Sequence, residues 1–218
     1  MKSNSLFLAA FAAAAVFSTG CSTLESLSPS GFRKADATAS TLQDAARAAN
    51  ESGVQIDAVL AALSNLVQNP QGDMKPQFQQ FDSALGNLKD RTDDFASNAA
   101  KMQDQGAAYF QKWDTEISAI KSENIRAQST DRKNAVMSRF DQVRAAYQQT
   151  QNEINPFLNR LNDIRTALAA DLTSAGLAAI RPAADRVTKD APDIRDALRQ
   201  RAHDFTELAN SLSTQPTQ

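Results

Sequence analysis

The sequence predicts an all-α protein, an elongated antiparallel coiled-coil bundle of about four long helices. Three observations support this prediction. Glycine occurs only 7 times in 218 residues, and the chain is rich in Ala, Gln, Leu, Asp and Arg, a composition that favours helix. Apolar residues recur in alternating steps of three and four along four segments, as in a heptad seam. Sustained period-two alternation and Asn-Gly turns, which indicate strands and hairpins, are missing from the sequence.

The first 20 residues have the composition of a cleaved signal peptide. Lys2 precedes an unbroken apolar run over residues 6–17, which is shorter than the roughly 20 apolar residues that span a bilayer. Small residues at positions 18–20 then lead into Cys21, the single cysteine of the chain. This order resembles the lipobox of bacterial lipoproteins, in which the cysteine is acylated and becomes the first residue of the mature chain.

We therefore expect a lipoprotein signal peptide over residues 1–20, followed by an acylated Cys21 and a flexible tether to residue 30. The alternative is an ordinary secretory cleavage site in which Cys21 has no role. Ser22 follows the cysteine, where an Asp would resemble an inner-membrane retention signal. We expect a protein that is lipid-anchored, in the outer membrane, and that faces the periplasm.

We expect one helical domain over residues 31–212. Its first helix ends before the turn residues 69–73. Its predicted seam is Phe32, Ala35, Ala39, Leu42, Ala46, Ala49, Gly53, Ile56, Leu60, Leu63 and Val67. The middle of this seam is small, so a neighbouring helix can approach closely there.

The second helix is predicted to start near Pro76, because proline is favoured in a first helical turn. Its seam is Phe78, Phe81, Leu85, Leu88, Thr92, Phe95, Ala99, Met102 and Gly106. The seam then shifts to Phe110, Trp113, Ile117, Ile120 and Asn124. Two successive steps of four make this shift a stutter, which locally unwinds a supercoil.

A third seam contains Pro156 but keeps its phase on both sides of it, which predicts a kinked, continuous helix. Its members are Val136, Phe140, Val143, Tyr147, Thr150, Ile154, Phe157, Leu161, Ile164 and Leu168. Thr173 and Ser174 offer cap hydroxyls for a fourth helix, with kinks expected at Pro182 and Pro192. The fourth seam is Val187, Ala191, Ile194, Leu198, Arg201, Phe205, Leu208 and Leu212. Residues 213–218 are expected to be disordered.

The boundary between the second and third helices is the one that the sequence marks least clearly. The seam changes phase near residues 127–131, but no glycine or proline forces a turn there. One architecture turns the chain near Ser129 and forms a four-helix bundle. The other keeps residues 76–172 as a single rod of ~145 Å with the outer helices folded back on it. We favour the bundle.

Catalytic and metal-binding patterns are missing from the sequence. His203 is the only histidine and has no cluster of acidic partners at helical spacing. A Gly-rich phosphate loop, a nucleophile elbow, HExxH and CxxC are all absent. The 23 basic and 25 acidic side chains interleave and create no overall field toward nucleic acid. We expect no enzyme activity, no cofactor, no metal and no nucleic-acid partner.

One segment concentrates aromatic and polar residues and forms the candidate site. It comprises Tyr109, Trp113, Glu116, Asn124, Arg126, Ser129 and Arg132. The first interpretation is a set of core aromatics at the stutter, and the second is a polar cluster that fixes register or forms a partner surface. An inward Trp113 would carry Glu116 toward the seam, where Arg126 or Arg132 is the candidate ion-pair partner if the chain turns near Ser129.

These residues also carry a family resemblance. The motifs are Tyr109-Phe110-x-x-Trp113-x-x-Glu116, Asn124-x-Arg126-x-x-Ser129-x-x-Arg132, Asn155-Pro156-Phe157-Leu158, and the run over residues 172–180. From about residue 32 to 212 the chain resembles a family of bacterial lipoproteins catalogued as domain of unknown function 2959. The resemblance implies an elongated helical lipoprotein and implies no activity.

The expected function is therefore that of a non-enzymatic structural or adaptor rod, anchored to a membrane and presented to an unidentified protein partner. The alternative is a helical bundle that binds a lipid or small molecule in envelope homeostasis, which an inter-helix cavity of roughly 300 Å³ or more would favour. A homo-oligomer is compatible with either function.

Overall fold

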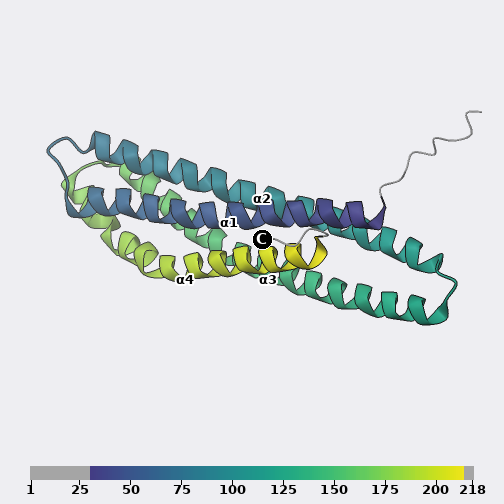
Figure 1. Cartoon of the computed structure of the whole chain (residues 1–218). Helices are drawn as coiled ribbons and strands as arrows, with labels where there is room; N and C mark the ends of the chain where they lie inside the picture. Colours follow the sequence, from purple (N-terminus) through teal and green to yellow (C-terminus); the bar gives the residue numbers. More distant parts are fainter. Residues whose placement is uncertain (1–29, 214–218) are drawn as a thin grey trace, which may run out of the picture.

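The computed structural model describes residues 30–213, so the predicted signal peptide, Cys21 and nearly all of the predicted tether and tail lie outside the described residues. Four helices follow one another: α1 (Gly31–Gln68), α2 (Lys75–Ser118), α3 (Glu123–Ala170) and α4 (Ser174–Leu212). They run alternately up and down in an elongated bundle (Figure 1). Residues 30–213 contain no strand. The predicted all-α antiparallel bundle is confirmed.

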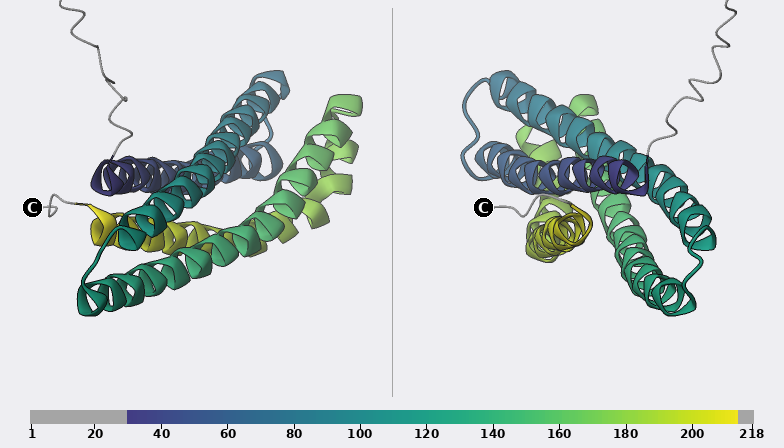
Figure 2. Two further views of the ribbon diagram at one scale, coloured as in Figure 1. Left: turned by 90° about the vertical axis from the view of Figure 1, so that its right-hand side faces the viewer. Right: turned by 45° about the vertical axis from the view of Figure 1, so that its right-hand side comes forward.

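Each helix packs on the two helices that follow and precede it around a ring, and α4 closes the ring against α1. The diagonal pairs do not approach each other within residues 30–213. Figure 2 shows this arrangement from two further sides. The interfaces of α1 with α2 and with α4 are the two most extensive of the ring, and α1 accordingly buries two adjacent stripes rather than one. The stripe that the seam did not predict contains Thr38, Thr41, Ala45, Ala48, Ser52, Val59 and Leu66.

Most predicted seam positions lie in the core, and the exceptions are at the helix ends and stripe edges. All ten predicted seam residues of α3 are buried. Phe32 is wrong as a core residue, because its side chain is 57% exposed at the first turn of α1. Arg201 also stays partly exposed while its neighbour Ala202 is buried. The side chain of Arg201 forms an ion pair with Asp204 at 3.0 Å instead of entering the core.

The predicted caps and prolines lie where the sequence placed them. Proline occupies the first turn of α2, and the Thr173 hydroxyl accepts a hydrogen bond from the Gly176 N–H at 3.2 Å at the start of α4. α3 continues through Pro156, and α4 through Pro182 and Pro192. α4 curves along its length in Figure 1, as expected where prolines remove helical hydrogen bonds.

The turn between α2 and α3 corrects the predicted boundary. The chain turns at residues 119–122, not near Ser129, and Ser129 lies in the second turn of α3. Ser118 ends α2, and the backbone N–H groups of Ala119 and Ile120 close the helix on the carbonyls of Glu116 and Ile117. The single-rod alternative is thereby excluded.

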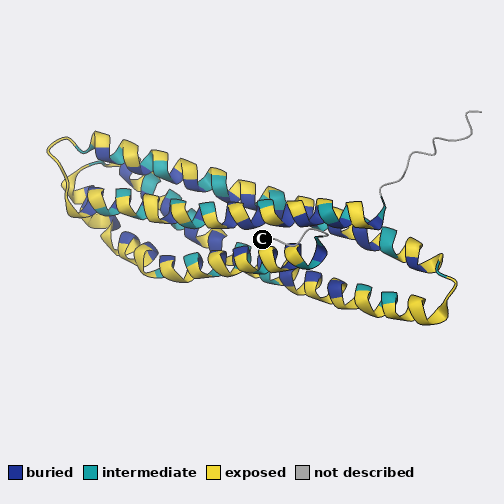
Figure 3. Cartoon of the chain, viewed as in Figure 1, coloured by how far each residue is buried: buried dark blue, intermediate teal, exposed yellow. Residues whose placement is uncertain are grey.

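The α2–α3 turn extends past the start of α1 and the end of α4 (Figure 1). We call this part of the molecule, which holds all three features, the hairpin end. Its outer surface is largely exposed in Figure 3. The α1–α2 turn (residues 69–74) and the α3–α4 turn (residues 171–173) lie together at the opposite end.

Aromatic rings fill the core on both sides of a close helix approach. Phe95, Tyr147 and Phe205 meet in the middle of the bundle, with the first two rings edge to face at 5.1 Å between centroids. Further along, Phe140 packs edge to face on Phe110 at 5.5 Å. Gly106 of α2 lies against this Phe140 ring, and a Cβ atom there would come within 2.6 Å of Cε2. The ring therefore occupies the space that any larger residue at position 106 needs.

We predict that Gly106→Ala destabilises the bundle even though alanine is the better helix former. The methyl group must displace a buried, doubly packed ring, and overpacking of this kind costs about 1–3 kcal/mol. The matched control is Gly86→Ala on the same helix, where nothing lies within 4 Å of the added Cβ and where we expect a gain of about 0.5–1 kcal/mol. Chemical denaturation followed by circular dichroism measures both, and equal effects would contradict the close approach.

Candidate interaction site at the hairpin end

Three aromatic side chains of α2 form the inner wall of the candidate site. Tyr109 is buried and stacks on Phe110 and on Trp113, each at 5.2 Å between ring centroids. Trp113 is only partly buried, and it packs against the edge of the core. Its indole Nε1–H donates to the Ser129 hydroxyl of α3 at 3.3 Å. The structure thus joins Tyr109, Trp113 and Ser129 across the two helices, and Trp113 lies between the core and the surface.

The electrostatics of Tyr109 reflect this enclosure. Burial raises the pKa of Tyr109 from its ordinary value of 10 to about 12, because the phenolate loses its hydration. The positive charge of Arg132 opposes the rise in pKa, and the negative charge of Glu116 adds to it. Both charged residues therefore lie close enough to act on the phenol.

Glu116 has a different partner from the one expected. Its Oε1 accepts a hydrogen bond from the backbone N–H of Gly31 at 2.9 Å, and Lys112 lies 3.8 Å away on the same helix. The predicted ion pair with Arg126 or Arg132 is wrong, because the chain does not turn near Ser129. The carboxylate lies beside the start of α1 instead, Arg132 bonds to the Ser211 carbonyl, and Arg126 faces solvent. The contact satisfies the first N–H of α1, which receives no hydrogen bond from the Ser30 side chain. The negative carboxylate also favours the positive end of the α1 dipole.

Of the remaining predicted residues, one links α3 to α4 and two are exposed at the start of α3. Arg132 Nη2 donates to the Ser211 carbonyl in the last turn of α4 at 3.2 Å, so it links α3 to α4. Asn124 accepts from Gln128 one turn along α3 at 3.3 Å and lies exposed with Arg126. These two residues face solvent and do not join the aromatic wall.

Residues that the motif analysis missed complete the surface. Phe32 and Ile125, at the first turns of α1 and α3, are each 57% exposed. The guanidinium of Arg33 lies over the Phe32 ring at 6.0 Å from its centroid. Lys121 in the turn is exposed as well. No sequence signal marked Phe32 and Ile125 as surface residues, because their exposure depends on where α1 and α3 begin relative to the neighbouring helices.

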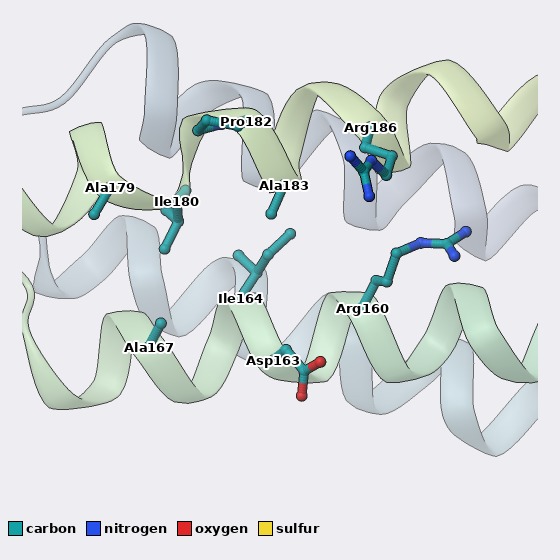
Figure 4. A pocket seen from close by; sticks show the side chains of 9 residues that line it. All are labelled: Arg160, Asp163, Ile164, Ala167, Ala179, Ile180, Pro182, Ala183 and Arg186. Atoms are coloured by element: carbon teal, nitrogen blue, oxygen red, sulfur yellow. The ribbon is translucent and has the colours of Figure 1, made fainter.

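A hollow lies between α3 and α4, on the side of the α3–α4 turn at the opposite end of the bundle (Figure 4). It has a volume of about 430 Å³, and Ile164 and Ile180 form its floor. Arg160 and Arg186 lie at one end of it, and Asp163 of α3 lines it as well (Figure 4). Arg160 also pairs with Asp190 at 2.8 Å, while its buried Nε–H has no hydrogen-bond acceptor.

Residues 30–213 contain neither a metal-binding cluster nor a membrane-spanning helix. In this part of the chain no three His, Cys, Asp or Glu residues are arranged to hold a metal ion. No helix within the same residues has the length and apolar character needed to cross a membrane.

Comparison with known proteins identifies a family. The family described as "Protein of unknown function (DUF2959)" matches residues 22–210, which is most of the chain. No curated protein and no solved structure matches this sequence. The predicted membership of the family catalogued as domain of unknown function 2959 is confirmed.

We predict that Tyr109 makes the bundle less stable at alkaline pH. Its pKa is about 12 in the folded chain and 10 in the unfolded chain, so its contribution is complete below pH 10 and falls as the pH rises toward 12. The expected loss is about 2 kcal/mol. Denaturation of wild type and Tyr109→Phe between these pH values measures it, and the variant should lose less stability.

The matched control is Tyr147→Phe, because the chain has only 2 tyrosines and burial raises the pKa of Tyr147 too. Each single variant should retain the drop that belongs to the other tyrosine. Ultraviolet absorbance of the tyrosinate gives each pKa directly, and an ordinary pKa in Tyr147→Phe would contradict the burial of Tyr109.

Proposed function

As the chain belongs to the family described as "Protein of unknown function (DUF2959)", we propose that it is a lipid-anchored envelope protein that acts as a structural or adaptor rod. In this proposal it carries no enzymatic activity, faces the periplasm, and is held through Cys21, in the outer membrane of a two-membrane cell. Its helical body then presents side chains to a protein partner at a distance from the bilayer.

The observation that carries the proposal is the filled, extended core. Buried apolar residues follow one another along α1 to α4 from Ala35 to Leu212. α3 alone has 48 residues, which is ~72 Å of helix. A long body whose apolar seams are used for internal packing has the build of a spacer.

The charged surface is consistent with a rod that stays extended. Every pair of adjacent helices is joined by at least one ion pair, among them Glu51–Arg91, Asp57–Arg195, Asp82–Arg165 and Arg160–Asp190. Exposed pairs contribute about 0–1 kcal/mol each, so their main effect is on the register of the helices. The core supplies most of the stability.

The membrane anchor rests on the sequence around Cys21. Acyl chains contribute about 0.8 kcal/mol for each buried CH2 group, so several chains on one cysteine hold a protein firmly. The amphipathic helices described above bury their apolar stripes against one another. A cysteine-linked lipid is then the means of attachment that the proposal requires.

We predict that Cys21→Ala abolishes both acylation and recovery in the membrane fraction. Metabolic labelling with palmitate, followed by fractionation, measures both properties. Ser22→Ala is the control, because it alters the adjacent residue and keeps the thiol. A Cys21→Ala protein that is still labelled and membrane-bound refutes the anchor.

A second function has one specific observation in its favour. The volume of the hollow between α3 and α4 is above roughly 300 Å³, the lower limit for small-molecule sites. Its floor is apolar, and two guanidinium groups lie at one end. An acyl chain with a carboxylate head has the matching chemistry. The hollow is an open surface groove rather than an enclosed cavity, so the rod remains the first proposal.

If the groove binds such a ligand, a fluorescent fatty acid should brighten on addition to the purified protein. Ala183→Trp should abolish the signal, because the indole fills a groove that Ala183 lines. The control is Ala178→Trp, an exposed position on the same helix that does not line the groove. Binding that is absent from wild type, or equal in both variants, rules out the binding function.

A further inference from the structure

The topology of the bundle decides which end an anchor at Cys21 holds near the bilayer. The start of α1 lies at the hairpin end, and the hydrogen bond from Gly31 N–H to Glu116 fixes it beside the last turns of α2. Only residues 22–30 separate Gly31 from Cys21, and they span at most ~30 Å. α1 has 38 residues and is itself ~57 Å long. The anchor therefore keeps the hairpin end close to the lipid, and the opposite end can stand away from it.

The surface of the hairpin end suits a lipid headgroup layer. It exposes one aromatic and one aliphatic side chain, Phe32 and Ile125, each 57% accessible. Cationic groups lie next to both: Arg33 over the Phe32 ring, and Lys121 and Arg126 on either side of Ile125 in the sequence. Aromatic and aliphatic groups flanked by Lys and Arg are the combination that interfacial segments use.

Several acidic groups at this end are already occupied. Asp114 pairs with Lys133 of α3, and Glu116 accepts from the Gly31 N–H. Glu123 lies in the first turn of α3, where the positive end of the helix dipole favours a carboxylate. Arg33, Lys121 and Arg126 form no ion pair within residues 30–213, so these cations are available to anionic headgroups.

We propose that the hairpin end docks on the anionic surface of the bilayer that holds Cys21, with Phe32 and Ile125 at the headgroup boundary and Lys121 and Arg126 on the phosphates. This inference depends on the proposed anchor. It adds that the bundle stands on this end, which leaves the α1–α2 and α3–α4 turns as the membrane-distal surface.

The test compares the two ends of the lipidated protein. The full protein is purified from membranes and reconstituted in vesicles of phosphatidylethanolamine and phosphatidylglycerol. Because acylation consumes the Cys21 thiol, a new cysteine provides the single attachment point for a fluorophore. Ala119→Cys places it in the α2–α3 turn, and Gly72→Cys places it at the opposite end, where nothing lies within 4 Å of an added Cβ.

A short-range quencher on the lipid headgroups should quench the fluorophore at position 119 several-fold more strongly than the one at position 72. Equal quenching at both positions means that the bundle lies flat and overturns the inference. Absence of quenching at position 119 overturns it as well. Protein recovered without lipid in the soluble fraction overturns both the anchor and the docking, whereas lipidated protein with an unquenched hairpin end overturns the docking alone.

A second set of variants separates contact from mere proximity through the tether. Phe32→Ser and Ile125→Ser, in the Ala119→Cys background, should lose most of the quenching. Val54→Ser is the matched control, because Val54 is 64% exposed on α1 but lies away from the hairpin end. Quenching that survives both end variants shows that the tether alone brings the turn near the bilayer, and the docking surface is then wrong.

Discussion

The structure depends on one constraint: no helix of this chain can bury its apolar stripe alone, and α1 must serve two neighbours at once. Its face toward the bundle is rich in Ala, Ser and Thr, so both α2 and α4 can approach it closely. The opposite side of the core is filled by large rings from α2, α3 and α4, such as Phe95, Tyr147 and Phe205. Small residues on one helix and large rings on the other three together give a filled core.

Helix identity could be read from the sequence because the three-four spacing is a local property. It correctly placed the ten buried positions of α3 and the Thr173 cap. The α2–α3 turn was misplaced because residues 119–122 contain neither glycine nor proline. The chain turns there because α2 and α3 pack against each other as separate helices, and this packing is a tertiary effect. The second stripe of α1 was missed for a related reason, since a single seam does not show how many neighbours a helix has.

The candidate site was predicted in part. Tyr109, Trp113, Ser129 and Arg132 do lie at one end of the bundle, because helical spacing and an α2–α3 reversal bring them together. The sequence could not show that Glu116 bonds to Gly31, since 85 positions separate the two residues. Exposure of Phe32 and Ile125 was equally hidden, because it depends on where α1 and α3 begin relative to their neighbours. Local chemistry was thus readable, and the pairing across the fold was not.

The Gly31–Glu116 hydrogen bond sets a rule for how the lengths of α1 and α2 can change during evolution. A single inserted residue between Gly31 and the α1–α2 turn would rotate one helix end by about 100° and shift it by about 1.5 Å. The seam would then leave the core, and the carboxylate would no longer meet the first N–H of α1. Matched insertions or deletions of seven residues in both helices preserve the seam and the cap together. Homologous chains should therefore differ in length by whole heptads within α1 and α2, and by single residues only in the turns.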